Sequence, residues 1–212
     1  MAFDANDLSP HEHFVVNRTN AGEIADFSAM GGPGGAKPAV RAGFLRKLLL
    51  RLDPSWTIRT PGVRIKGARI EGVLDLTDCS GEGLPALALT DCEISEIVDL
   101  SHARLARVSF AGSRMSRLIA VEAEINGELN LCGVAPLNDV LTAKLRGIRV
   151  DGDVLARDAK FARAIDSEDD ALMLQGADIN GNLLLDGSFE AFGCVWLANA
   201  KIQGGLACEG AT

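Results

Sequence analysis

The segment Ala123-Glu-Ile125-Asn-Gly127-Glu-Leu129-Asn-Leu131 decides the fold, because its pattern A-x-I-x-G-x-L-x-L recurs along the chain. Full copies occupy residues 68–76 and 177–185, a degraded copy occupies 200–208, and a partial copy occupies 148–154. Such self-similarity is typical of repeat proteins, in which each unit buries its apolar face against the next one. We therefore expect a solenoid.

Apolar side chains recur at every fifth position between Leu100 and Ile125, and a small or apolar residue stands two positions before each of them. An α-helix would rotate every fifth residue by about 140° from the last, and a flat strand would alternate faces. A chain that turns a corner after every five residues directs both positions inward, and four such sides close a coil of about twenty residues. The centres are Leu100, Leu105, Phe110, Met115, Ala120 and Ile125, and the residues before them are Val98, Ala103, Val108, Ser113, Leu118 and Ala123.

This pattern resembles that of the pentapeptide-repeat proteins, A(D/N)LXX. The match lies in Ala103-Arg-Leu105-Ala-Arg107, in Ala123-Glu-Ile125-Asn-Gly127 and, more loosely, in Ala177-Asp-Ile179-Asn-Gly181, and the likeness covers about residues 63–212. It implies an all-β fold, a right-handed, four-sided parallel β-helix of about 20 residues per coil with stacked coils. The centres Ile125, Val150, Ile179 and Ile202 lie 25, 29 and 23 residues apart, so later coils carry insertions.

The segment Phe189–Cys208 also resembles the units of large, mostly uncharacterised bacterial proteins. Some of those proteins carry the label of a membrane-associated oxidoreductase. The motif that would support this activity is absent from the present sequence. The second likeness therefore adds to the expectation of a repeat fold and predicts no activity.

Residues 1–60 do not repeat, and we expect them to form a small helical cap on a β-helix of residues 61–212. Asn20 and Glu23 have capping-box spacing for a helix near 21–29. A second, amphipathic helix is expected over about 38–52, beginning at Pro38, and should cover the first coil around Val63 and Ile65. Its basic side is an alternative surface for a membrane or a nucleic acid. The apolar side holds Val40, Phe44, Leu45, Leu48 and Leu52, and the basic residues are Arg41, Arg46, Lys47 and Arg51.

Composition is that of one moderately sized domain. The 212 residues are 47% hydrophobic, with no apolar run long enough for a membrane span and no signal peptide in residues 1–20. The five cysteines include no C-x-x-C motif, which indicates free thiols and a cytoplasmic location. Cys92 stands two positions before Ile94, where the repeat needs a small buried group, and is expected to be a packing residue.

Charge divides unevenly along the chain. Residues 1–60 hold seven Lys/Arg and six Asp/Glu, a balance of +1, whereas residues 61–212 hold fourteen and twenty-three, a balance of −9. An acidic rod repels phosphates, so direct binding of nucleic acid is not expected. The same charge permits mimicry of DNA, although the regular coil carries Arg104, Arg107, Arg114 and Arg117 on its outside.

No segment satisfies a catalytic or ligand-binding motif. The run from Gly31 to Pro38 lacks the G-K-[S/T] ending of a phosphate-binding loop, and Gly32-Pro-Gly34 lacks the third glycine of a dinucleotide site. His11 and His13 could offer two metal ligands from one side of an extended segment, but no Cys or His cluster accompanies them. The acidic run Asp166–Asp170 lacks the glycine of a calcium loop, and His102 is expected at an outward corner without a nucleophile.

We therefore predict no catalytic, cofactor-binding or metal-binding residues and no enzyme activity. The leading interpretation is a non-catalytic scaffold or protein-interaction module on an acidic β-solenoid, with a protein partner of unknown identity. The alternative is a DNA-mimicking binder of a type II topoisomerase such as gyrase, as in some pentapeptide-repeat proteins. Nothing after Ala200 can cover the last coil, so Ile202 and Leu206 should favour a homodimer through that end or the continuation of coils in a longer chain.

Overall fold

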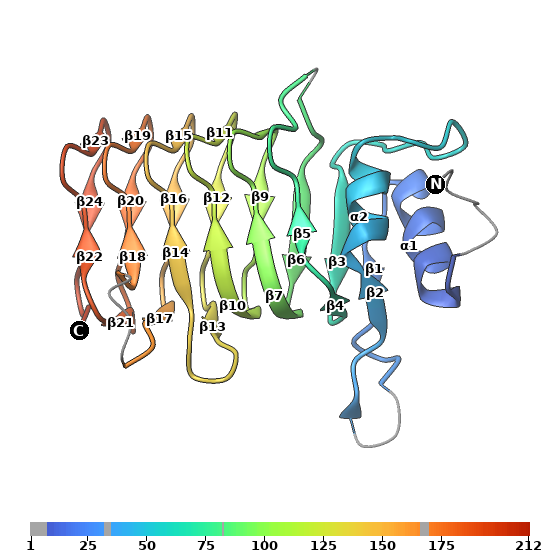
Figure 1. Ribbon diagram of the computed structural model, residues 1–212, viewed down its shortest axis with the longest axis horizontal. Coiled ribbons are helices and arrows are strands. Elements are labelled where there is room, and N and C mark those ends of the chain that lie inside the picture. Colours follow the sequence, from blue (N-terminus) through green and yellow to red (C-terminus); the bar gives the residue numbers. More distant parts are fainter. Residues whose placement is uncertain (1–7, 32–34, 82, 166–169) are drawn as a thin grey trace.

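The computed structural model describes residues 8–31, 35–81, 83–165 and 170–212. The chain forms an all-parallel β-solenoid of about six turns with about 24 residues per turn, and two short helices lie at its N-terminal end (Figure 1). The fold class expected from the repeated phrase is confirmed. The C-terminus lies at the opposite end of the rod from the helices (Figure 1).

Each turn has four short sides, which stack into four faces. The first face is a sheet of β8 (Arg104–Leu105), β11 (Glu124–Ile125), β15 (Arg149–Val150), β19 (Asp178–Ile179) and β23 (Lys201–Ile202). The second face is a sheet of β1 (Ala25–Asp26), β3 (Val63–Lys66), β6 (Leu87–Thr90), β9 (Val108–Ser109), β12 (Leu129–Asn130), β16 (Val154–Leu155), β20 (Leu183–Leu184) and β24 (Leu206–Ala207).

Two long strands, β7 (Glu93–Asp99) and β10 (Arg114–Ile119), run through both remaining faces, and their pairing shifts register between Met115 and Arg117. The third face adds β2 (Ala39–Arg41), β4 (Arg69–Glu71), β13 (Ala135–Pro136), β17 (Lys160–Ala162) and β21 (Glu190–Phe192). The fourth face adds β5 (Leu74–Asp75), β14 (Thr142–Lys144), β18 (Leu172–Met173) and β22 (Val195–Trp196).

The inward register follows the step of five. All of the centres from Leu100 to Ile125 are buried, as are the six residues that stand two positions before them. Val150 and Ile179 are buried on later turns, so one apolar column fills the rod from turn to turn. Ile202 was expected to be buried as well but is only half-buried, because no further turn lies over it among the described residues.

Turn length varies, and most of the variation lies at one corner. The turn from Arg104 to its partner Glu124 holds 20 residues, and the next turn, from Glu124 to Arg149, holds 25. The following turn, between Asp151 and Asn180, holds 29. The larger insertions stand between β13 and β14 and between β17 and β18, where the third face meets the fourth (Figure 1). Extra residues there leave the four stacked sides in register.

Two other corners use a left-handed backbone in every turn. Between the fourth and first faces, the left-handed residues are Asp78, His102, Glu122, Gly147, Gly176 and Asn199. Between the second and third faces, they are Gly67, Asp91, Gly112, Gly133, Asp158, Gly187 and Gly210. Glycine, Asp and Asn tolerate this conformation best, which explains most of these positions. A Cβ at Gly112 would overlap the carboxylate of Asp91 in the preceding turn, so glycine leaves room for the Asp side chain in this position.

In the copies at 123–131, 148–154 and 177–185, the glycine of the pattern A-x-I-x-G-x-L-x-L lies at the corner between the first and second faces. Gly152 donates its N–H to the carbonyl oxygen of Gly127 at 3.0 Å, and Gly181 donates to that of Gly152 at 3.1 Å. A Cβ at Gly152 would lie 2.9 Å from both the carbonyl carbon and the oxygen of Gly127. Only glycine lets the two backbones approach so closely at this corner.

The copy at residues 68–76 lies at a different corner from the others. Its Ile70 belongs to β4 on the third face, and its Leu74 begins β5 on the fourth face. Gly72 has a left-handed backbone and no atom within 4 Å of a Cβ built there. The same sequence pattern therefore occurs at two different corners of the turn. The copy at 68–76 lies on the third and fourth faces, whereas the copy at 123–131 lies on the first and second.

The N-terminal helix was misplaced in the sequence analysis. α1 runs over Pro10–Ala21, with a capping box made by Ser9 and Glu12, and not by Asn20 and Glu23. Residues 25 and 26, which were expected to be helical, form β1 and pair with Ile65 and Lys66 of β3. Pairing with an existing strand edge prevails over a weak capping signal.

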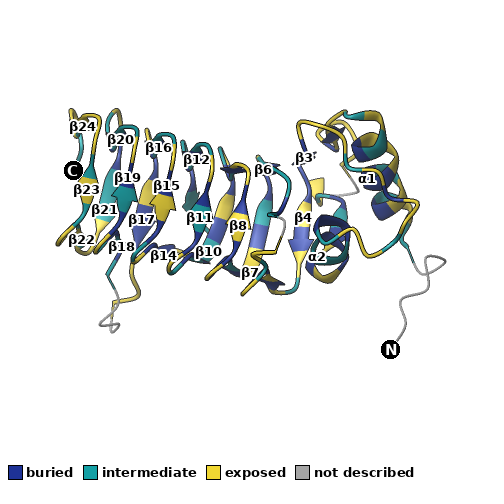
Figure 2. Cartoon of the chain, turned by 90° about the horizontal axis from the view of Figure 1, so that it is seen from above, coloured by how far each residue is buried: buried dark blue, intermediate teal, exposed yellow. Residues whose placement is uncertain are grey.

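The second helix is shorter than expected. α2 runs over Ala42–Leu49, and residues 39–41 form β2, which pairs with β4. Pro38 does not begin the helix, and its carbonyl oxygen accepts a hydrogen bond from Arg69 N at 2.8 Å. Phe44, Leu45 and Leu48 are buried as expected, whereas Leu52 is 60% exposed beyond the helix end. α2 packs against β2 and β5, and α1 packs against β1, β2 and β3, so both helices cover the N-terminal end of the rod (Figure 2).

We expect Gly152→Ala to lower the free energy of unfolding by about 1–3 kcal/mol, because the added methyl group would overpack against backbone that cannot move without stretching the stacked turns. Gly205→Ala is the matched control, since the nearest atom to its Cβ is the side-chain Oδ1 of Asn182 at 3.4 Å. Chemical denaturation of both variants would test this. Equal stability of the two variants would contradict the close approach of the turns.

Candidate functional site

His11 and His13 lie on α1, not on an extended segment. Residues two positions apart on a helix point to different sides, so the two rings do not converge. His11 Nδ1 lies 3.3 Å from the carbonyl oxygen of Ala39, and its ring meets the edge of Phe27, whereas His13 is exposed. Among the described residues, no group of three or more His, Cys, Asp or Glu is placed to hold a metal ion.

Two further candidates fall partly outside the described residues. Residues 166–169 of the acidic run and residues 32–34 of the glycine-rich segment belong to this part of the chain. Asp170, the last acidic residue of the run, is half-buried at the start of the segment that leads into β18.

The first face carries a charge ladder, by which we mean its outward residues Arg104, Glu124, Arg149, Asp178 and Lys201, which are paired in register. Arg104 Nε lies 2.7 Å from Glu124 Oε2, and Arg149 Nη1 lies 2.9 Å from Glu124 Oε1. The hydrogen bond from Arg104 outweighs partial burial and lowers the pKa of Glu124. Exposed pairs of this kind each contribute about 0–1 kcal/mol.

His102 stands at a neighbouring corner and is exposed, as its outward corner position predicts, and its backbone is left-handed. Its Nδ1 lies 3.8 Å from Glu122 Oε2 in the next turn. A coil of twenty residues predicts that positions twenty apart stack in adjacent turns, His102 beside Glu122 and Arg104 beside Glu124, and both pairs are confirmed. His102 thus contacts the carboxylate of the residue at the same corner in the next turn, and this contact joins two stacked turns.

The arginines of the regular turn do not form one basic surface. Arg104 belongs to the first face, Arg114 to the third and Arg117 to the fourth, and Arg117, expected to be exposed, is half-buried. On the third face, Lys160 Nζ lies 2.8 Å from Glu190 Oε1, so charges of opposite sign also meet there. Positive and negative side chains are thus interleaved around the rod.

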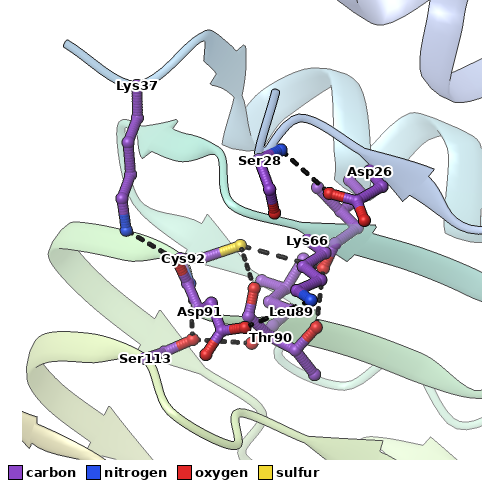
Figure 3. A network of polar contacts seen from close by, with 10 residues as sticks. Asp26, Ser28, Lys37, Lys66, Leu89, Thr90, Asp91, Cys92 and Ser113 are labelled. Atoms are coloured by element: carbon purple, nitrogen blue, oxygen red, sulfur yellow. Dashed lines mark hydrogen bonds and ion pairs between the residues drawn. The ribbon is translucent and has the colours of Figure 1, made fainter. Parts of the chain in front are cut away.

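Cys92 is a packing residue at the corner between the second and third faces (Figure 3). Its thiol is fully buried, 3.3 Å from the carbonyl oxygen of Thr90, and its N–H donates to Ser113 Oγ at 2.9 Å. Ser113 in turn donates to the carbonyl oxygen of Leu89 at 2.7 Å. Burial raises the pKa of Cys92 to about 11, so the thiol stays protonated and unreactive at neutral pH.

Glu12 is a fully buried carboxylate that joins α1 to the first turn of the rod. It accepts hydrogen bonds from Ser9 N at 2.9 Å, from Arg41 Nε at 2.8 Å and from Arg41 Nη2 at 2.7 Å. Burial by itself would raise the pKa of Glu12, but the hydrogen bonds and the charge of Arg41 outweigh it, and the pKa is lowered. Arg41 was expected on the basic side of a helix, and its contact with Glu12 was not predicted.

The last turn leaves apolar groups in solvent at the C-terminal end (Figure 2). None of the residues from 190 to 212 is buried, whereas Phe189 and the inward residues before it are. Phe192 is 67% exposed, Trp196 is 45% exposed and Leu206 is 51% exposed. Leu206 stands opposite buried Leu183, and half-buried Ile202 stands opposite buried Ile179, so the last coil is uncovered around both, as expected. Trp196 stands opposite Met173 and points outward.

A hollow of about 390 Å³ lies where the segment after α2 meets the second face. Arg51, Arg59 and Arg107 line it, together with apolar side chains. This group was not predicted from the sequence, because its members lie far apart in the chain and meet only through the stacking of turns. No local motif signals them.

No protein-family model, no curated protein and no solved structure matches this chain. The class that the fold defines is a parallel β-solenoid with two short helices at its N-terminal end. Within the described ranges, neither helix has the length and apolarity needed to cross a membrane.

We expect Glu12→Gln to lower the free energy of unfolding by about 2–3 kcal/mol at pH 7, because it removes a buried charged acceptor of Arg41. Since the folded-state pKa of Glu12 is lowered, its stabilising effect is complete above the ordinary pKa and is lost as the pH falls through the folded-state value. The difference between wild type and variant should therefore shrink in acid. Glu23→Gln, which removes an exposed partner of Arg18, should cost less than about 1 kcal/mol. A pH-independent difference would contradict the assignment.

Proposed function

We propose that the protein is a non-catalytic interaction module, a divergent relative of the pentapeptide-repeat proteins that binds another protein through its last turn. The observation that carries this proposal is the contrast between the two ends of the rod. Two helices cover the N-terminal end, and buried Glu12 of the first helix forms an ion pair with exposed Arg41. The turn of residues 190–212 instead holds half-exposed and exposed apolar side chains. The four-sided turn with two inward residues on each side supports the family relation.

The strand edges of the last turn support recognition by backbone pairing. β22, β23 and β24 each pair with a strand on one side only among the described residues. Free strand edges beside exposed apolar groups are a template for another strand. A rigid rod loses little conformational entropy when such an edge is bound, which favours affinity.

A second copy of the chain is the partner that we propose for this end. Ile202 and Leu206 stand symmetrically about Gly204, two positions on either side. In a two-fold arrangement about this corner, an antiparallel pairing would place Ile202 of one copy against Leu206 of the other. Each copy would then cover the apolar groups that its partner exposes.

Mimicry of DNA would need a continuous acidic surface, and the charge ladder alternates in sign instead. We therefore favour the interaction module over the topoisomerase-binding alternative. All five cysteines are free thiols, which supports the cytoplasmic location that we propose.

Light scattering at two protein concentrations tests the proposed partner. The wild-type chain should approach about twice its mass of 22.3 kDa at the higher concentration. Ile202→Lys should keep it monomeric, because the substitution would place an unpaired charge between the two apolar turns. Gln203→Lys adds the same charge at an exposed neighbour and should still dimerise. A wild-type chain that is monomeric at both concentrations would refute the dimer, and equal effects of the two variants would refute the place of the contact.

A further inference from the structure

The hollow at the N-terminal part of the rod is built by three separate segments. The stretch after α2 contributes Arg51 and residues 58–62, and the second contribution comes from Pro85 and Ala86 just before β6. The third comes from Ala106 and Arg107 just before β9 in the next turn. Its volume of about 390 Å³ lies within the range of small-molecule sites. We call it the arginine pocket, after Arg51, Arg59 and Arg107.

The charge of the arginine pocket is not neutralised by its own surroundings. The described residues that line it include no Asp or Glu. Arg59 donates one hydrogen bond, from Nε to the carbonyl oxygen of Asn20 at 2.8 Å, and that acceptor is uncharged. The side chains of Arg51 and Arg107 form no hydrogen bond or ion pair with any described residue and remain available to a ligand.

Most arginines elsewhere in the chain meet a carboxylate. This contrast matters because the chain carries a net charge of −8, so acidic side chains are plentiful. The three arginines of the pocket differ from these paired arginines in having no acidic partner among the described residues. The arginines that form ion pairs are Arg18, Arg41, Arg46, Arg69, Arg104, Arg149 and Arg157.

The remaining lining is apolar apart from Thr60, and two of the carbonyl oxygens at the pocket are already hydrogen-bonded. Ile58, Pro61 and Pro85 offer hydrocarbon surface between the arginines. Val63 N donates to the carbonyl oxygen of Ala86 at 2.9 Å, and Leu87 N donates to that of Arg107 at 3.0 Å. A ligand would therefore be held by guanidinium groups at its charged end and by apolar contact along its body.

We propose that the arginine pocket binds a small organic phosphate monoester. A guanidinium group matches phosphate oxygens with two parallel hydrogen bonds, and a phosphate brings nearly two negative charges and three acceptor oxygens to three arginines. The apolar lining takes the organic group of the ester. This site is separate from the proposed dimer contact at the last turn and does not depend on it.

Isothermal titration calorimetry with phenyl phosphate tests the site on the full chain, with inorganic phosphate and phenol as the two partial probes. Phenyl phosphate should bind more tightly than either partial probe, because only it fills both the charged and the apolar parts. Absence of heat from phenyl phosphate at millimolar concentrations would overturn the proposal. Binding of inorganic phosphate as tight as that of phenyl phosphate would overturn the role of the apolar lining.

Arg107→Gln and Arg51→Gln should each weaken phenyl phosphate binding by about tenfold or more, because each removes a charged donor. Arg114→Gln is the matched control, since Arg114 is an exposed arginine on the third face, outside the pocket. All three variants should melt at the wild-type temperature, as the substituted side chains are exposed. Equal weakening by Arg114→Gln would show that binding follows overall charge and would overturn the assignment.

Discussion

Backbone hydrogen bonding between successive turns is the constraint on which the whole rod depends. Most of its strands are only two residues long and could not persist as isolated pairs. Each is held by the turn before it and the turn after it, and the corners are bonded in the same way. His102 N donates to the carbonyl oxygen of Val121 at 2.9 Å, and Gly147 N donates to that of Gln175 at 2.8 Å. Left-handed corners and stacked glycines follow from this requirement.

The same constraint decides where the sequence can change. A side that gained a residue would lose its register and turn its apolar side chains outward. The corner between the third and fourth faces is free of this restriction, and it takes the segments between β13 and β14 and between β17 and β18. A shorter insertion lies on the first face, where Cys79 and Leu84 stand opposite Ala103 to Leu105 of the next turn. The rod therefore combines a strict interior with a few places on its outside that accept extra residues. Turns of 20 and 29 residues can then stack in one column.

The two proposed binding sites consist mainly of groups that find no partner among the described residues when the turns stack. Glu124 of the ladder pairs with Arg104 and Arg149 of the neighbouring turns, and Glu12 of α1 pairs with Arg41. Two places differ from the rest of the described surface. The last turn exposes apolar side chains and strand edges, and the arginine pocket gathers positive charge beside an apolar lining. These two places carry the proposed dimer contact and the proposed phosphate site.

The sequence by itself determined the solenoid, the inward register from Leu100 to Ile125 and the pairing of Arg104 with Glu124, because a step of five residues leaves only one way to bury every centre. Only the tertiary structure decided which corner each copy of the repeated pattern occupies. The copy at 68–76 has the same inward pattern as that at 123–131, and pairing with neighbouring turns assigns them to different corners. It also decided that residues 25–26 and 39–41 are strands and that Arg51, Arg59 and Arg107 share one pocket. Local propensity and spacing carry no information on such contacts, because stacked turns bring together residues that lie tens of positions apart.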